Sequence, residues 1–436
     1  MLHAMRETLC IVGLGYVGLP LAHAFAKCTK KKYDVCGFDI NAKRIEELRQ
    51  GIDRTNELTT KQLRSVKIEY GTDPSIIKKA DFVIMAIPTP VDERNKPDLT
   101  PVEKATHTVG KYLKQGAIVV YESTVYPGVT EDICGKILAQ ESGLQCGKDF
   151  FLAYSPERIN PGDKEHTVEN IVKVVSGQDK QTLKKVAALY ESILKYKPHR
   201  APNIKVAEMA KAIENAQRDL NIAYINEIAM LCGKIGIATT DVLNAASTKW
   251  NFLRFQPGLV GGHCIGVDPY YLVEKAKMLG METHVITAGR AVNDGMAQYV
   301  AEQVLAKLPQ RGHGSRILIL GATFKENIPD TRNSKVADVV SALQEAHATV
   351  FVHDAELSGE DLLHLGYSPV VLEKELKQHK GYYDAVLLLV AHKQYVEEMS
   401  PAQIAQLLKT RGVLFDLKSI FKRKTIEDAG KIYLAL

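Results

Sequence analysis

The residues best suited to covalent chemistry lie in a glycine-rich loop, 257–266, in which Cys264 follows two glycines. Glycine gives such a backbone the freedom to bring a thiol close to a ligand. Because the thiolate is the reactive form, a nearby cation would help, and Lys211 is a candidate. The six other cysteines are interpreted as small buried hydrophobic residues. Asp268 stands before a proline, as a helix N-cap does, which is compatible with a chemical role, and His263 is interpreted as shaping the loop.

A second motif, GLGYVG, follows a short apolar run, and its expected cofactor contacts are Gly13, Gly15, Tyr16, Val17 and Gly18. Glycines in this pattern allow a tight turn and the close approach of a pyrophosphate, whose charge a helix N-terminus favours. Asp39 ends the next apolar run, where its carboxylate would accept hydrogen bonds from a ribose and repel a 2′-phosphate. NAD is therefore predicted over NADP, although Lys43 and Arg44 could soften the preference. The alternative is a glycine-rich turn without a ligand.

Two further groups of polar residues have positions that suit a binding site. Lys211 and Asn215 are four residues apart in a helical pattern and therefore project from one face, for which a solvated charged surface is the simpler interpretation. Ser123-Thr124 and the segment 155–158 (SPER) each follow an apolar run, at the edge where open α/β sheets bind ligands. Turn formation explains these two segments equally well.

The elements that must position these residues begin with short apolar runs that alternate with helical patterns. Because the runs are continuous rather than alternating, they predict strands buried on both faces, in a mostly parallel sheet covered by helices. This first α/β part ends near Lys197. The expected strands are 9–12, 34–38, 82–87, 117–121, 151–154 and 171–175.

A helical middle part follows. Apolar residues recur at helical spacing over 202–237 and predict one long helix, and helical patterns continue to about Leu305, interrupted by the loop 257–266. A polar linker is expected at 310–315, followed by a second α/β part with strands at 317–320, 349–353, 385–390 and 413–415. The fold class is therefore α/β, with two doubly wound domains joined by a central helical domain.

Composition excludes several classes of protein. The 436 residues include 56 Lys and Arg and 51 Asp and Glu, a net charge of +5, which is too weak to indicate a nucleic-acid or membrane-surface partner. The seven cysteines form no CxxC pair, so neither a disulfide framework nor a metal site is expected. No apolar run approaches the ~20 residues that span a bilayer, and no signal peptide is recognised. A cytoplasmic protein is expected.

Taken together, these motifs resemble the nucleotide-sugar 6-dehydrogenases of the UDP-glucose and GDP-mannose dehydrogenase superfamily. The resemblance covers nearly the whole chain and implies a Rossmann NAD-binding domain over 1–197, a central dimerisation and catalytic-loop domain over 198–309, and a Rossmann-like UDP-binding domain over 310–436. The matching segments are GLGYVGLP near the start, the Ser-Thr-Val segment at 123, SPER at 155, EMAKAIEN at 208, GGHCIGVDPYYL at 261 and GATFKENIPDTRNS at 321.

The resemblance implies oxidation of a sugar C6 alcohol to a carboxylate, with two NAD and one water. Cys264 matches the nucleophile that captures the aldehyde as a thiohemiacetal, whose oxidation leaves a thioester. The other implied roles are oxyanion stabilisation by Lys211 with Asn215, positioning of water by Asp268 and Thr124, and thioester hydrolysis by Glu157. The implied substrate contacts are Glu157, Arg158, Lys211, Asn215, Gly261 and Lys325, and further implied cofactor contacts are Arg44, Thr89, Thr124 and Arg332.

One departure from the glucose and mannose enzymes concerns the substrate. They usually carry a serine before the cysteine and a Lys-Asp pair after it, where this chain has His263 and Val267-Asp268. The form found here is similar to the branch acting on UDP-N-acetylglucosamine and UDP-N-acetylgalactosamine, which supplies uronic acids for bacterial surface polysaccharides. The resemblance also implies a homodimer, and Lys249 and Arg254 lie where some members donate an arginine from the partner subunit.

Three other functions remain open from the sequence. The protein could be a UDP-glucose 6-dehydrogenase, or a two-electron hydroxyacid dehydrogenase of similar layout that would not need Cys264. A catalytically silent NAD-binding sensor is the third alternative. The presence of Cys264, Lys211, Asn215 and Asp268 argues against a silent protein.

Overall fold

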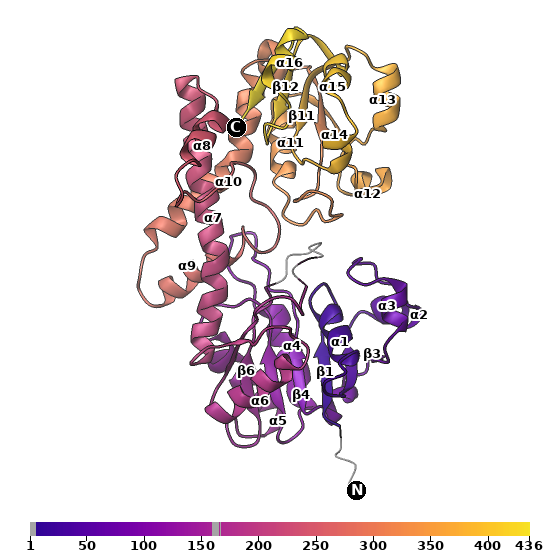
Figure 1. The fold of residues 1–436 in the computed structure, drawn as a ribbon, viewed down its shortest axis with the longest axis vertical. Coiled ribbons are helices and arrows are strands. Elements are labelled where there is room, and N and C mark those ends of the chain that lie inside the picture. The colour runs from indigo at the N-terminus through magenta and orange to yellow at the C-terminus, as the bar shows by residue number, and fades with distance from the viewer. Residues whose placement is uncertain (1–5, 159–164, 166) are drawn as a thin grey trace. The chain divides into compact units, whose positions relative to one another are not determined.

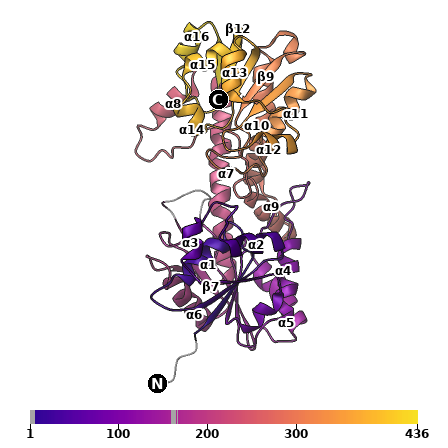
Figure 2. The same cartoon turned by 90° about the vertical axis from the view of Figure 1, so that its right-hand side faces the viewer.

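The computed structural model describes residues 6–158, 165 and 167–436 (Figures 1 and 2). The described chain forms two compact units, each built around its own sheet. The first unit comprises residues up to 214 together with 270–281, and the second comprises 215–269 together with 282–436. The expected α/β class, with parallel sheets and helices between them in the sequence, is confirmed. The division into domains 1–197, 198–309 and 310–436 stays a proposal.

The first unit contains an eight-stranded sheet in the order β3-β2-β1-β4-β5-β6-β7-β8. Neighbouring strands run parallel, except that β6 and β7 are antiparallel. The apolar runs of the central strands are buried on both faces, as expected for a sheet between two layers of helices. The bounds are β1 Thr8–Val12, β2 Asp34–Phe38, β3 Glu69–Gly71, β4 Phe82–Met85, β5 Ile118–Tyr121, β6 Phe151–Tyr154, β7 Val174–Gly177 and β8 His199–Arg200.

Helices cover both faces of this sheet (Figure 2). Side chains of α1 and α6 share one core with strand residues such as Ile11. On the opposite face, the Thr106 hydroxyl of α4 lies 3.0 Å from the Tyr121 hydroxyl of β5. The helices are α1 Gly18–Ala26, α2 Ala42–Gln50, α3 Thr60–Arg64, α4 Thr100–Lys111, α5 Gly135–Ser142 and α6 Lys180–Glu191, with shorter turns η1 Pro74–Lys79 and η2 Val129–Cys134.

Some strand predictions for this unit were wrong in detail. The strand expected at 171–175 lies at Val174–Gly177, because Val172 is exposed and the pairing that anchors β7 joins Tyr154 to Ser176. The strand expected to reach residue 87 ends at Met85, two residues before a segment with prolines at 88 and 90, which cannot donate to a strand ladder. Strands β3 and β8 were not predicted, because each is short and largely polar.

The long helix predicted over 202–237 is confirmed as α7, Ile204–Ile235. It begins after Asn203, whose side chain accepts a hydrogen bond from the Val206 amide at 2.9 Å, and it ends before Gly236 in the left-handed conformation. Three more helices follow, namely α8 Thr239–Ala246, α9 Asp268–Met278 and α10 His284–Leu305.

The second unit contains a parallel five-stranded sheet in the order β10-β9-β11-β12-β13. The residues expected to form a linker lie partly in the turn η3, Pro309–Gly312, which contains two residues with positive φ, Gln310 and Arg311. The strands are β9 Arg316–Leu320, β10 Thr349–His353, β11 Tyr383–Leu388, β12 Leu408–Asp416 and β13 Ile432–Ala435. The helices are α11 Val336–Glu345, α12 Gly359–His364, α13 Leu372–Gln378, α14 Lys393–Glu397, α15 Pro401–Leu407 and α16 Arg423–Asp428.

The described residues lack two features that would suggest other functions. No helix among them is long and apolar enough to cross a membrane. Nor do they contain a group of three or more His, Cys, Asp or Glu side chains arranged to hold a metal ion.

Candidate active site

The glycine motif forms a tight turn between β1 and α1. Gly13 has φ of 89°, and a Cβ there would lie 2.5 Å from the Ala86 carbonyl oxygen. A Cβ on Gly18 would lie 1.8 Å from the Gly13 carbonyl oxygen, whereas Gly15 faces open space. The first and third glycines are therefore required by packing, and the second leaves room for a ligand. This geometry fits a dinucleotide pyrophosphate at the N-terminus of α1.

Asp39 stands at the end of β2 and braces this turn. Its Oδ2 accepts a hydrogen bond from the Leu14 amide at 2.9 Å, and its Oδ1 accepts one from the Asn41 amide at 2.9 Å. Each carboxylate oxygen can accept a further hydrogen bond, which suits the two hydroxyls of a ribose. Asp39 therefore lies directly after β2 and beside the glycine turn, as the motif spacing predicted.

Arg44 lies beneath the same turn and is buried. Its Nε donates to the Leu14 carbonyl at 2.9 Å, and its guanidinium forms an ion pair with Asp53 at 2.8 Å. Although burial opposes it, hydrogen bonds from Thr55, the Leu58 amide and Arg44 lower the pKa of Asp53. The charge of Arg44 is thus compensated inside the unit, which favours a supporting role for it.

The other expected residues of the first unit follow the strand ends at one edge of the sheet. Thr89 follows β4, and its carbonyl accepts a hydrogen bond from the Tyr271 hydroxyl at 3.0 Å. Thr124 follows β5, next to Ser123, whose hydroxyl accepts from the Ile87 amide. Because these strands are parallel neighbours, their carboxyl ends meet at this edge.

Glu157 and Arg158 follow β6 at the same edge. The Glu157 amide donates to the Glu122 carbonyl at 3.3 Å. Arg158 pairs with Glu214 of α7 at 2.8 Å and donates to the Val172 carbonyl at 2.6 Å. Lys211, one turn before Glu214 on α7, is 7% exposed. A nearly buried ammonium suits a ligand that carries or develops negative charge.

Asn215 and Asp268 are brought together in the second unit. The Asn215 amide donates to Asp268 Oδ2 at 2.6 Å, and both side chains are buried. Asp268 is the first residue of α9, rather than the cap before a helix starting at 269. The reason is that its own amide already donates to the Cys264 carbonyl at 2.8 Å, so the helical turn starts within the loop.

The loop that carries Cys264 is held on both sides. Asn226 of α7 bonds the backbone of Gly258 through both its amide nitrogen and its oxygen, at 3.0 and 2.8 Å. Gly262 has φ of 80°, and its carbonyl accepts from Asn333 at 3.2 Å. A Cβ on Gly261 would lie 2.6 Å from the Asn333 carbonyl oxygen, so Gly261 is needed for close packing.

His263 is directed at the thiol. Its Nδ1 lies 3.2 Å from Cys264 Sγ, and its Nε2 lies 3.7 Å from Asp330 Oδ2, an ion-pair distance rather than a hydrogen bond. Asp330, with a smaller contribution from Cys264, raises the pKa of His263 to about 9. Arg332, expected on the cofactor side, donates to the Asp330 carboxylate through Nε at 3.0 Å and Nη2 at 2.5 Å.

His263 and Asp330 are two candidate site residues to which the sequence analysis gave no chemical role. His263 was interpreted only as shaping the loop, and Asp330 lies in the quoted segment GATFKENIPDTRNS without having been singled out. A histidine next to the candidate nucleophile was the available signal. Nothing in the spacing shows that Asp330, 67 positions after it, lies beside its ring.

The second unit contains the same kind of contact, in which a carboxylate at a strand end accepts hydrogen bonds from the backbone of a glycine turn. Gly321, with φ of 93°, follows β9, and the amides of Ala322 and Thr323 donate to Asp354 Oδ2 at the end of β10. Here, however, the His392 ring also bonds Asp354 Oδ2, at 3.1 Å, and Thr323 Oγ1, at 3.1 Å. The His392 imidazole therefore contacts the Asp354 carboxylate, whereas the hydrogen bonds described for Asp39 come from two backbone amides.

Lys325, the expected substrate contact, follows this second turn and has an exposed side chain. The Thr323 hydroxyl donates to the Lys325 carbonyl at 3.0 Å, and the Asn327 amide donates to His392 Nδ1 at 2.9 Å. His392 thus fixes the backbone on which Lys325 stands.

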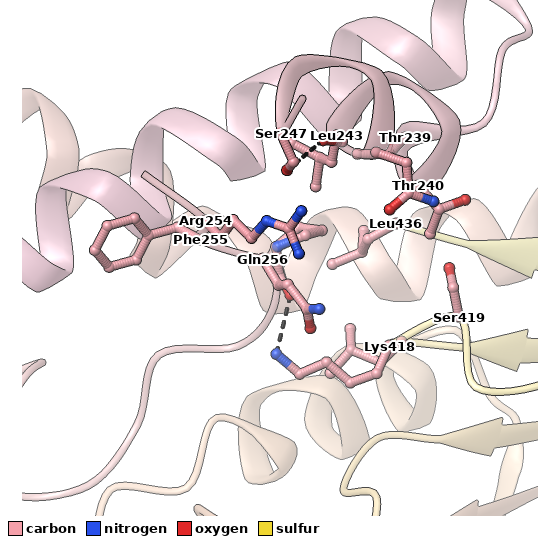
Figure 3. A pocket seen from close by; sticks show the side chains of 13 residues that line it. Thr239, Thr240, Leu243, Ser247, Arg254, Phe255, Gln256, Lys418, Ser419 and Leu436 are labelled. Carbon is pink, nitrogen blue, oxygen red and sulfur yellow. Dashed lines mark hydrogen bonds between the residues drawn. The ribbon is translucent and has the colours of Figure 1, made fainter. Parts of the chain in front are cut away.

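The second unit also contains a cavity of about 650 Å³ including its mouth, shown in Figure 3. Lys418 donates to the Pro257 carbonyl at 3.0 Å, and burial lowers the pKa of Lys418. Arg254 and Phe255, next to the catalytic loop in sequence, line the opposite part of the cavity. The remaining lining residues are Thr239, Thr240, Leu243, Asn244, Ser247, Gln256, Pro257, Leu417, Ser419 and Leu436.

Comparison with known proteins identifies the class. Three family models match in order: the UDP-glucose/GDP-mannose dehydrogenase family NAD binding domain over residues 7–194, the central domain over 205–295 and the UDP binding domain over 318–423. The chain belongs to the UDP-glucose/GDP-mannose dehydrogenase family. It is an oxidoreductase that uses NAD, as the glycine motif and Asp39 indicated.

Individual relatives match over nearly their whole length. Protein CapL from Staphylococcus aureus is 49% identical over 98% of this chain and 100% of its own. The UDP-N-acetyl-D-glucosamine 6-dehydrogenase of Pseudomonas aeruginosa is 50% identical over 94% of this chain and 96% of its own. Among solved structures, the UDP-D-ManNAc dehydrogenase of Pyrococcus horikoshii has a TM-score of 0.88 at 28% identity and covers 98% of this chain and 99% of its own.

Proposed function

We propose that the protein is a UDP-N-acetylhexosamine 6-dehydrogenase that oxidises the sugar C6 alcohol to a carboxylate through a covalent bond to Cys264. The observation that carries the proposal is the construction of the catalytic loop. It places the Cys264 thiol beside a histidine and links the Cys264 carbonyl to the amide of Asp268, which is in turn bonded to Asn215. A thiol in such surroundings is suited to capture an aldehyde.

The residues divide the work by their chemistry. Cys264 Sγ attacks the C6 aldehyde, and the carbonyl electron pair moves to oxygen. Lys211, nearly buried and cationic, supports the proposal of oxyanion stabilisation. Asp268, with Asn215, and Thr124 would orient the water that later cleaves the thioester, and Glu157 would remove its proton. NAD, when bound at the glycine motif, accepts hydride from the sugar.

The substrate proposal rests on the acetamido branch of the family. Two observations support it: His263 and Val267 flank the proposed nucleophile where the glucose enzymes usually carry serine and lysine, and the chain is 50% identical to a protein named UDP-N-acetyl-D-glucosamine 6-dehydrogenase. A site built around an acetamido group loses about 1 to 3 kcal/mol when its polar groups are left unpaired, or about 5- to 150-fold in kcat/KM. UDP-N-acetylglucosamine or UDP-N-acetylgalactosamine is therefore proposed as substrate. The uronic acid would serve surface polysaccharide synthesis in the cytoplasm.

A panel of three sugars tests the proposal. We expect UDP-N-acetylglucosamine or UDP-N-acetylgalactosamine to exceed UDP-glucose by about ten-fold or more in kcat/KM at equal, subsaturating concentration. Each turnover should form two NADH per sugar. UDP-glucose matching both acetamido sugars would overturn the substrate assignment, and one NADH per sugar would overturn the four-electron reaction.

We also propose a homodimer. Several large apolar side chains of the second unit are exposed in the single chain, and Trp250 is 92% exposed. Exposed apolar side chains that recur at helical spacing, as at 224, 231 and 235, favour a protein partner, and a second copy is the simplest one. The exposed residues concerned are Tyr224, Leu231 and Ile235 on α7, with Ile237, Trp250 and Leu253 after it.

A further inference from the structure

His263 occupies a position between the nucleophile and an acid. One ring nitrogen, Nδ1, lies 3.2 Å from Cys264 Sγ, and the other, Nε2, lies 3.7 Å from the Asp330 carboxylate. The Phe324 ring packs beside the imidazole, with 5.9 Å between ring centroids. The ring therefore has a polar contact at each nitrogen and an apolar one at its side.

Asp330 is itself fixed for this role. Its side chain is 5% exposed and accepts hydrogen bonds from the Arg332 guanidinium and from the Arg332 amide. Although burial opposes it, the nearby His263 ring and the hydrogen bonds from Arg332 hold the pKa of Asp330 well below its usual range. Asp330 is thus ionised at neutral pH.

The charges around the ring favour its protonated form. Asp330 first and Cys264 second raise the pKa of His263 to about 9, while burial and the Arg332 cation oppose the rise. A protonated imidazole beside a thiol stabilises the thiolate, which is the nucleophilic form of cysteine.

We propose that His263, held by Asp330, is a further catalytic residue that keeps Cys264 as a thiolate and stabilises the same thiolate when it leaves. This inference rests on the proposed role of Cys264 as nucleophile. The ion pair forms when the Cys264 proton moves from Sγ to Nδ1 of the neutral His263 ring, so that the thiolate and the imidazolium that Asp330 favours arise together.

The bonds and protons then balance through the rest of the reaction. The thiolate forms the C–S bond to the C6 aldehyde, whose π electrons move to oxygen. NAD, the oxidant of the family's reaction, would accept the hydride of this adduct, which gives the thioester. Water then attacks the thioester carbonyl, its proton goes to the proposed base Glu157, and the C–S bond breaks. The electron pair returns to sulfur, and the adjacent imidazolium stabilises the thiolate without a further proton transfer.

Alkylation of Cys264 tests this directly and needs neither NAD nor sugar. The rate of modification of the Cys264 peptide by iodoacetamide is followed by mass spectrometry between pH 5 and 10, which separates it from the other cysteines. The proteins compared are the unaltered enzyme, His263→Gln, Asp330→Asn and, as a control with an exposed histidine on α12, His364→Gln.

We expect half-maximal alkylation about one pH unit or more higher in His263→Gln than in the unaltered enzyme, with Asp330→Asn between them and His364→Gln unchanged. Superimposed profiles for His263→Gln and the unaltered enzyme would overturn the inference. So would half-maximal alkylation of the unaltered enzyme at about pH 8.5, the value of an ordinary thiol, a result that does not depend on any variant folding. Failure of the proposed function is distinguished because it would appear as uronic acid formation by Cys264→Ala.

Discussion

At the scale of single residues, the site combines groups that act with groups that only hold them. Asp39 belongs to both kinds, because its carboxylate braces the Leu14 amide and still has acceptor capacity for a ribose. Arg44 belongs to the second kind, since Asp53 and the Leu14 carbonyl already engage its guanidinium. Substitution of Asp39 should therefore change the preference between NAD and NADP, whereas substitution of Arg44 should weaken the glycine turn.

Substitution of Cys264 by alanine should abolish net formation of uronic acid, because no thiohemiacetal or thioester can form. Binding of NAD, measured by calorimetry, should be nearly unchanged, because the glycine motif and Asp39 belong to the first unit. Cys146→Ala, which alters an exposed thiol, is the matched control and should retain activity. Appreciable acid formation by Cys264→Ala would show that the covalent mechanism is wrong.

The preference for NAD over NADP should depend on Asp39. A like charge about 4 Å from a phosphate costs about 1 to 4 kcal/mol, depending on screening, so NAD should be favoured about ten-fold or more in kcat/KM. Asp39→Asn should narrow the ratio of kcat/KM for NAD to kcat/KM for NADP, whereas Lys61→Ala, at an exposed position of α3, should leave it unchanged. Equal use of the two cofactors by the unaltered enzyme would contradict our interpretation of Asp39.

At the scale of elements, α7 and α10 are joined by a buried polar network that has no part in the chemistry. Arg290 of α10 pairs with Asp219 of α7 at 2.6 Å, and Asn293 also donates to Asp219. Burial raises the pKa of Asp219, and Arg290 opposes that rise. The pair therefore joins α7 and α10, and the loop that carries Cys264 lies between these two helices in the sequence.

Replacement of Arg290 by leucine should lower the free energy of unfolding by about 3 to 5 kcal/mol, because it leaves the Asp219 carboxylate buried without its cation. Urea denaturation followed by circular dichroism measures this. Arg423→Ala removes an exposed pair with Glu427 on α16 and should cost about 1 kcal/mol at most. A similar small effect for both variants would mean that the buried pair contributes little.

The elements also show what the sequence can and cannot predict. Strands such as Asp34–Phe38 and Phe151–Tyr154 were predicted to the residue, because each apolar run ends directly before a polar residue, Asp39 or Ser155. Strand β12 begins at Leu408, five residues before the expected start, since its KTRG segment resembles a turn. It continues as a strand through an irregularity at Arg411, whose φ is 59°, and such a bulge leaves no simple mark in sequence.

The sequence predicted those contacts of the candidate site that join residues close together in the chain, and it did not predict the distant ones. The glycine turn and Asp39 follow from spacing within one βαβ unit, and the structure has them in contact. The pairing of Asn215 with Asp268 and of His263 with Asp330 joins residues that are 53 and 67 positions apart. Contacts of that kind depend on how whole elements pack, so no pattern in one sequence predicts them.

At the scale of the whole molecule, the proposed homodimer should appear in solution. Light scattering across a micromolar range should give twice the mass of one chain. Tyr224→Glu, on the exposed apolar residues of α7, should weaken association because it buries a charge. Val371→Glu, at an exposed apolar residue just before α13, should leave association unchanged. A monomer throughout that range would contradict the proposal.

The two braces of the molecule differ in one respect that bears on the timing of turnover. Asp39 keeps acceptor capacity, whereas Asp354 receives two amides and the His392 ring on a single oxygen. Among the described residues, Asp39 is therefore the proposed ribose contact of this type. On the proposed route each sugar gives up two hydrides, so spent cofactor must depart and be replaced while the sugar remains attached to Cys264. The covalent bond between the sugar and Cys264 must therefore last longer than the replacement of NADH by NAD. If it broke sooner, the enzyme would release free aldehyde.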